Sequence, residues 1–232
     1  MKKFIVPVLS ICFFISCSTD DTALNTVETT TDSASDGKIT TKSLNNPENP
    51  ANAFDYVGQL HTEILDDYLQ NHQDETTLTG IIDNVDATAV SNTDFVSISD
   101  DYSGLDAGIV QWTMANINYP KNIMNKAGLS ERGTLLMEDF IALIEILEFQ
   151  PYNDACNSIK AFESTVMNDG YLTESDEQII LSAASIARYS IYYSGIRVRK
   201  WSRTKNGITA SAFTNDVAEA VTMSVTADLL TN

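Results

Sequence analysis

Side chains suited to nucleophilic or metal chemistry are scarce in this sequence of 232 residues, which holds three cysteines and two histidines. A reactive cysteine needs a base close by, and for Cys156 that base could be His61 or His72. Cys156 falls instead within a helical pattern of apolar residues, which predicts a small buried core residue. His61 lies on the apolar stripe of another expected helix, so a core role is favoured over a ligand role. We expect no catalytic residue and no cofactor.

Two acidic segments could suggest calcium. The aspartates between Asp94 and Asp106 lack the alternating ligand spacing and central glycine of a calcium loop, so we interpret them as a solvated connection. Around Gly170, the register of such a loop would place Met167 at the third ligand position, where calcium needs an oxygen. HExxH, GxSxG, P-loop and paired CxxC patterns are absent from the sequence. We therefore predict no metal site, and an enzyme is the least favoured class of function.

The charge pattern that could mark a binding site lies at the end of a long expected helix. No acidic residue occurs between Glu177 and Asp216. A recognition patch for an anionic glycan or an acidic protein is one interpretation, with an aromatic side chain as its anchor. The candidate residues are Arg197, Arg199, Lys200, Trp201 and Arg203. The alternative, which we favour, is that these basic groups complement the helix dipole and pair with acidic residues of the same domain.

The first residues of the chain predict export and lipid anchoring. Lys2 and Lys3 precede an apolar run from Phe4 to Ile15, which has the length of a signal-peptide core and is too short to span a membrane. The run ends in Phe14-Ile15-Ser16-Cys17, which resembles a bacterial lipobox. The resemblance implies cleavage before Cys17, a diacylglycerol on its sulfur and an acyl chain such as palmitate on its amine. Two or three such chains would anchor the protein firmly in a membrane.

This interpretation divides the chain into a signal peptide at residues 1–16, a lipidated disordered linker at 17–50 and a helical domain at 51–232. The linker is rich in Thr, Ser, Asp and Asn, so burial cannot offset the entropy lost on ordering it. Its start, Ser18-Thr19-Asp20-Asp21, resembles the surface-export signal of lipoproteins from the Bacteroidota, although ordinary linker composition explains it equally well. We expect an outer membrane lipoprotein of the cell envelope, facing the periplasm or exposed on the cell surface.

Composition and periodicity together predict the fold. A net charge of −18 argues against binding to nucleic acid. Apolar residues at helical spacing predict an all-α domain, a single irregular bundle of about six or seven helices. The segment from Ser130 to Phe149 is apolar nearly all round, which predicts a central helix. Ile179 to Ile196 contains one charged residue, Arg188, and we expect an amphipathic packing helix there rather than a membrane span.

Two segments resemble a known group of proteins. Tyr56 to Leu69 (YVGQLHTEILDDYL) and Thr173 to Ser194 (TESDEQIILSAASIARYSIYYS) are similar to parts of small, uncharacterised helical lipoproteins of the Bacteroidota. The resemblance implies a class and a location but no activity. An envelope-anchored binding or interaction module is therefore the favoured function. An immunity or inhibitor lipoprotein is the alternative, and a hydrolytic enzyme without a recognisable motif comes last.

Overall fold

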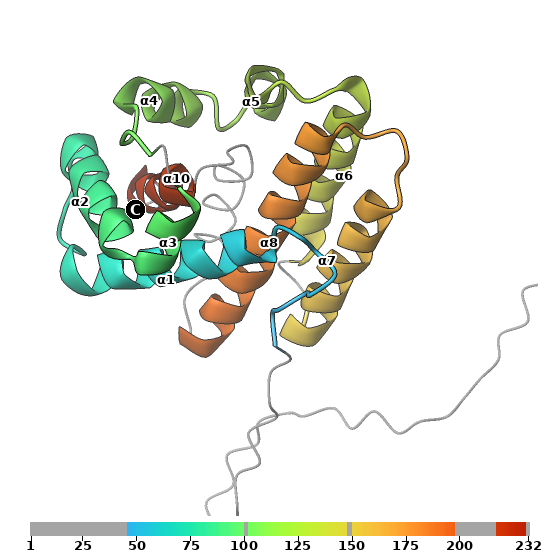
Figure 1. Ribbon diagram of the computed structural model, residues 1–232, viewed down its shortest axis with the longest axis horizontal. Helices are drawn as coiled ribbons and strands as arrows, with labels where there is room; N and C mark the ends of the chain where they lie inside the picture. Colours follow the sequence, from blue (N-terminus) through green and yellow to red (C-terminus); the bar gives the residue numbers. More distant parts are fainter. Residues whose placement is uncertain (1–45, 100–101, 148–149, 198–216, 231–232) are drawn as a thin grey trace, which may run out of the picture. The chain divides into compact units, whose positions relative to one another are not determined.

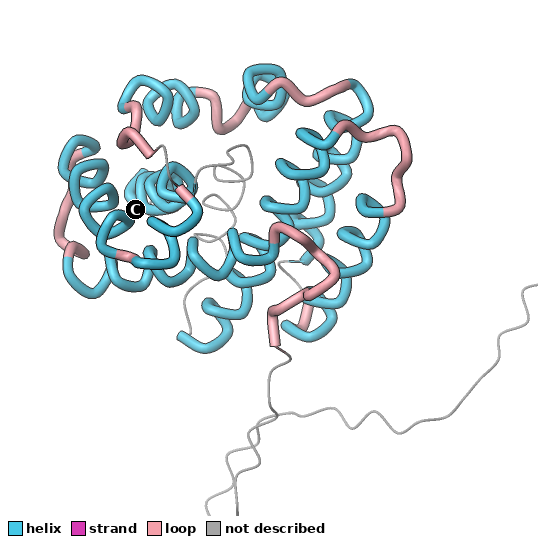
Figure 2. The backbone as a smooth tube through the Cα atoms, in the orientation of Figure 1, coloured by secondary structure: helices cyan, strands magenta, loops and turns pink. Residues whose placement is uncertain are grey.

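The computed structural model describes residues 46–99, 102–147, 150–197 and 217–230. In the range 150–197 side chains are described up to residue 193, and in the range 217–230 up to residue 227. Every regular element in these ranges is an α-helix, which confirms the predicted fold class (Figure 2). The chain divides into two units, Met1–Thr41 and Lys42–Asn232, and the described residues all belong to the second. Cys17, the expected signal peptide and the linker up to residue 45 lie outside the described residues.

Nine helices follow one another in the described part of the chain (Figure 1). They are α1 (Asp55–Asn71), α2 (Leu78–Ser91), α3 (Thr93–Ile98), α4 (Ala107–Ala115), α5 (Pro120–Ala127), α6 (Glu131–Leu147), α7 (Tyr152–Met167), α8 (Glu174–Arg197) and α10 (Val217–Leu230). Two short helices were not predicted. α3 forms where we expected a polar connection, because Asn92 caps it by accepting from the N–H groups of Asp94 and Phe95. α5 begins at Pro120, whose missing N–H is not needed in a first turn.

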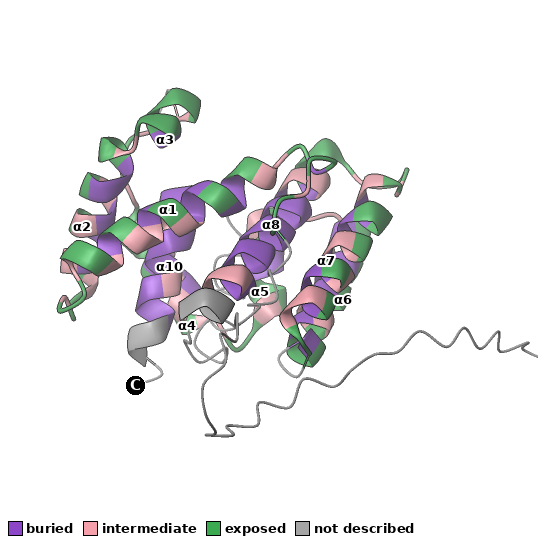
Figure 3. Cartoon of the chain, turned by 90° about the horizontal axis from the view of Figure 1, so that it is seen from below, coloured by how far each residue is buried: buried purple, intermediate pink, exposed green. Residues whose placement is uncertain are grey.

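α8 is the central helix, in place of α6. Every residue from Ile179 to Ile191 is buried (Figure 3), and α8 packs against α1, α6 and α7. The expectation of an amphipathic helix from Ile179 to Ile196 was therefore wrong: small residues let neighbouring helices approach on all sides, and Arg188, the one charged residue of this segment, is paired with buried carboxylates. α6 instead leaves Leu135 and Ile146 exposed to 49% and 59%.

Apolar side chains form two core clusters, and α8 contributes to both. The first joins α5, α6, α7 and α8 around residues such as Phe140 and Ile159. The second joins α1, α2, α3 and α10 around Ile64 and Val221, and Ile186 of α8 reaches into it. α10 occupies a segment rich in Ala and Thr, where no helix was predicted. Its small side chains allow it to pack closely on α1 and α2.

A close contact between α1 and α8 connects the two clusters. A Cβ atom on Gly58 would lie 2.4 Å from Oγ of Ser185 and 2.6 Å from its backbone, so no larger residue fits without a shift. The Gly58 N–H donates to Oγ of Ser185 at 3.2 Å, and that hydroxyl donates to the Asp55 carbonyl at 2.8 Å. Glycine is thus required here by the approach of a second helix.

Asp176 caps two helices at once. As the Thr173-x-x-Asp176 pattern predicts, it accepts from the N–H of Thr173 at 3.0 Å, while the Thr173 hydroxyl accepts from the N–H of Asp176 at 3.1 Å. The same carboxylate accepts from the N–H and hydroxyl of Ser130, which precedes α6, at 2.8 and 2.7 Å. The starts of α6 and α8 are therefore joined through one buried side chain.

Candidate functional site

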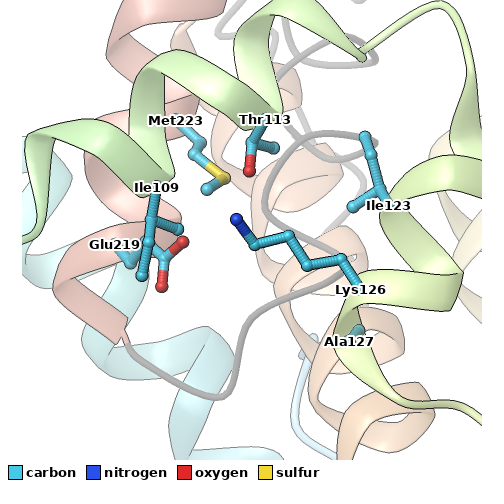
Figure 4. Close-up of a pocket in the computed structure, with 7 residues that line it drawn as sticks. All are labelled: Ile109, Thr113, Ile123, Lys126, Ala127, Glu219 and Met223. Carbon is cyan, nitrogen blue, oxygen red and sulfur yellow. The ribbon is translucent and has the colours of Figure 1, made fainter.

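A small pocket lies between α4, α5 and α10 (Figure 4). Its volume is about 150 Å³, and its lining comprises Ile109, Thr113, Ile123, Lys126, Ala127, Glu219 and Met223. A water molecule in the liquid takes up roughly 30 Å³, and pockets for drug-sized ligands start at roughly 300 Å³. The pocket therefore fits a single side chain or a molecule the size of an amino acid.

Lys126 brings a positive charge into this pocket. Its side chain runs from α5 across the pocket, toward the side lined by α4 and α10 (Figure 4). The ammonium nitrogen lies 4.3 Å from the centre of the Trp112 ring, a cation–π contact that restrains the flexible side chain. An ammonium group carries three N–H donors. While Lys126 contacts the Trp112 ring, its ammonium group can therefore still donate a hydrogen bond to the carboxylate of a bound ligand.

The remaining lining combines a carboxylate, a hydroxyl and an apolar floor. Glu219 of α10 and Thr113 of α4 supply the polar groups, and Ile109, Ile123 and Met223 supply most of the apolar surface. Among the described residues, the lining contains no cysteine, serine or histidine. The pocket therefore has groups that can orient a small ligand with an anionic end and an aliphatic part, but no nucleophile paired with a base.

A serine and a histidine do meet on the other face of α10. Nε2 of His61, from α1, lies 2.9 Å from Oγ of Ser224. Such a pair can serve as base and nucleophile when a third group orients the histidine, but Nδ1 of His61 makes no hydrogen bond. Ser224 also lies inside α10, where neighbouring N–H groups donate along the helix and not to an oxyanion. The geometry therefore suits helix packing better than acyl transfer.

Burial sets the protonation state of His61. The side chain is 1% exposed, which confirms the predicted core position. Burial lowers the pKa of His61 from 6.5 to about 4, and the Ala220 carbonyl offsets a part of this effect. His61 is consequently neutral at pH 7 and packs as a polar core residue.

The largest buried polar network surrounds Arg188, a residue of α8 with no exposed surface. Its Nε and Nη2 atoms donate to Oε1 of Glu163, on α7, at 3.1 and 2.9 Å. Nη2 also donates to the carboxylate of Asp55, on α1, and Nη1 donates to the Pro47 carbonyl. Arg188 thus joins three helices and the segment that leads into α1.

Glu163 is equally enclosed and is satisfied from several sides. In addition to Arg188, it accepts from the side-chain amides of Asn49 and Asn52, each at 2.7 Å. Asn52 precedes α1, which begins at Asp55, and its side-chain amide is directed into this network. Burial alone would lower the pKa of Arg188, yet Glu163 and Asp55 outweigh burial and raise it. The guanidinium group therefore remains charged, and its role is to fix the packing of α1, α7 and α8.

Only some of the site residues predicted from the sequence lie within the described part of the chain. Arg197 is the last residue of α8, and its side chain lies outside the described residues, as do Arg199, Lys200, Trp201 and Arg203. Cys156 is fully buried, which confirms the expected core position. The pocket around Lys126 was missed. Its residues come from the consecutive helices α4 and α5 and from α10, which begins only at Val217. Two of these helices, α5 and α10, were not predicted.

The described part of the chain contains neither a metal-binding cluster nor a membrane-spanning helix. In these ranges no group of three or more His, Cys, Asp or Glu side chains is arranged to hold a metal ion. None of the described helices is both long and apolar enough to cross a membrane.

Comparison with known proteins gives no relative. No protein-family model, no curated protein and no solved structure matches the chain.

Proposed function

We propose that this chain is a lipid-anchored lipoprotein of the bacterial cell envelope whose helical domain binds a ligand or partner without transforming it. The observation that carries the anchor is the sequence Phe14-Ile15-Ser16-Cys17 at the end of an apolar run. Cys17 would be the mature N-terminus, held in the outer membrane by its acyl chains.

The environment of the polar groups supports a binding role over a catalytic one. His61, Glu163 and Arg188 are buried in contacts between helices. The described pocket offers an ammonium group and an apolar floor, which are binding groups. An anionic glycan or an acidic protein remains the proposed partner of the basic segment around Trp201, and the membrane is contacted through the lipid.

Lipid anchoring is tested by replacing Cys17 with Ala and fractionating cells that express the full chain. We expect the unaltered protein in the detergent-extracted envelope fraction, labelled by a radioactive fatty acid, and the variant unlabelled in the soluble fraction. Cys156→Ala is the matched control, because it also removes a cysteine and should leave labelling intact. A Cys17→Ala protein that stays labelled in the membrane fraction would refute the proposed anchor.

A further inference from the structure

Two polar side chains in the pocket between α4, α5 and α10 have no hydrogen-bond acceptor within the described part of the chain. Thr113 is 4% exposed, yet its hydroxyl forms no hydrogen bond with any described residue. The ammonium group of Lys126 forms no ion pair in the same ranges, and its contact with the Trp112 ring supplies no acceptor. A buried hydroxyl without a partner costs free energy, which a bound molecule can recover.

Both groups are directed into the same space (Figure 4). The Thr113 hydroxyl points into the pocket from α4, and the Lys126 side chain reaches across it from α5. A carboxylate has two oxygens with about four acceptor positions. It can therefore accept from the ammonium group and from the hydroxyl at once, and the bond to the ammonium group is charge-assisted. The two donors thus favour an anionic acceptor.

The remaining space suits a short aliphatic chain. Ile123 and Met223 line it with 3% and 2% of their surface exposed, and Ile109 and Ala127 add further apolar surface. The pocket volume is about 150 Å³, and an engineered apolar cavity of roughly that volume in another protein binds benzene. The pocket therefore takes a ligand of about six or seven non-hydrogen atoms.

Glu219 limits the charge of that ligand. Its carboxylate belongs to the same lining as the ammonium group of Lys126, so the two side chains together add no net charge. One carboxylate gains from Lys126, whereas a second anionic group in so small a space would meet Glu219. The pocket therefore favours a monoanion over a dicarboxylate.

We infer that this pocket binds a small aliphatic monocarboxylate. Its carboxylate accepts from Lys126 and Thr113, and its carbon chain lies against Ile123 and Met223. The inference rests on the proposed binding role of the domain and names the chemical class of one ligand. This chemistry is common to short fatty acids and to aliphatic amino acids, so the experiment compares one of each.

The test is a nuclear magnetic resonance titration of the full chain, purified in detergent, with isovalerate, followed at the isoleucine and methionine methyl groups. We expect a Kd on the order of 1 mM for a ligand of this size. 3-Methylbutan-1-ol has the same carbon skeleton without the carboxylate, and glutarate carries a second carboxylate; each should bind about tenfold more weakly or worse. L-Valine is isovalerate with an added ammonium group, so tighter binding of one or the other identifies the ligand as an amino acid or as a fatty acid.

Two variants and a matched control assign the binding to this pocket. Lys126→Gln should weaken binding of isovalerate by about tenfold or more, and Thr113→Val, which keeps the shape of the side chain, by about threefold to tenfold. Lys121→Gln makes the same charge change on α5 at a side chain that is 76% exposed and paired with Glu138. It should leave the Kd within about twofold, because Lys121 is not among the described lining residues. Lys126 is exposed, so its variant remains informative even if Thr113→Val folds poorly.

Equal affinity of the unaltered protein and Lys126→Gln for isovalerate would overturn the inference. Equal weakening by Lys121→Gln would overturn it as well, as would binding of 3-methylbutan-1-ol as tight as that of isovalerate, or no binding at about ten times the expected Kd. The same spectra show whether isovalerate is chemically converted. Conversion would contradict the proposed function, binding without transformation, and would leave the ligand site in place.

Discussion

Acid should destabilise this protein through His61 well before its carboxylates are protonated. The histidine is neutral and buried in the folded chain, with a pKa lowered from 6.5 to about 4. In the unfolded chain the same ring takes up a proton as the pH falls below 6.5. The unfolded state therefore binds the proton first, and the stability present above pH 6.5 is lost progressively as the pH falls toward 4.

The size of this loss follows from the difference between the two pKa values. A shift of one pKa unit corresponds to about 1.4 kcal/mol, so the 2.5 units between 6.5 and about 4 give a limiting loss of about 3 kcal/mol. Between about pH 7 and about pH 5, the free energy of unfolding should fall by about 2 kcal/mol from this residue alone. That is a large part of the roughly 5–15 kcal/mol that holds a typical domain together.

The assay is urea unfolding followed by circular dichroism at several pH values, for the unaltered protein and for His61→Gln. The variant cannot gain a proton at this position. Between about pH 7 and about pH 5, its free energy of unfolding should therefore fall by about 2 kcal/mol less than that of the unaltered protein. His72→Gln is the matched control and should keep the pH dependence of the unaltered protein. Nuclear magnetic resonance titration of His61 gives the pKa directly, even if His61→Gln folds poorly. A measured pKa near 6.5, or equal pH dependence of the protein and the His61 variant, would refute the reasoning.

Three further changes test the packing and the basic segment. Gly58→Ala should lower the free energy of unfolding by about 1–3 kcal/mol, because its Cβ would collide with the backbone of Ser185; unchanged stability in urea would contradict the close helix contact. Arg188→Met should cost about 3–5 kcal/mol by leaving Glu163 buried without its cation, and a double variant with Glu163→Met should recover part of the loss. Arg199→Glu should change stability by less than about 1 kcal/mol and reduce capture of an anionic partner if the basic segment is a recognition patch; a loss beyond about 2 kcal/mol would indicate internal pairing instead.

The fold was predictable where local patterns act alone. The capping box at Thr173 marks the start of α8, and the apolar segment from Ser130 to Phe149 located α6 within a few residues. Local patterns failed where the outcome depends on tertiary packing. α10 mixes small residues with valine and methionine around its whole circumference, so its sequence shows no apolar stripe, and it becomes a core helix because α1 and α2 pack against it.

The site was less predictable than the fold, for a physical reason. Arg188 stands out in the sequence as the one charge in a long apolar segment, but its partners Asp55 and Glu163 are 133 and 25 residues away. No spacing rule connects residues at such separations. Lys126 is likewise unremarkable in the sequence, and it lines a pocket only because α4 and α10 supply the other walls.

The uneven distribution of charge explains why one arginine matters so much to this domain. α1 to α4 contain no lysine or arginine, so any cation that meets their carboxylates comes from elsewhere in the chain or from another molecule. Arg188 supplies such a charge at Asp55, where α1 begins, and shares it with Glu163. The same lack of basic residues therefore makes α1 depend on α8 for a buried partner.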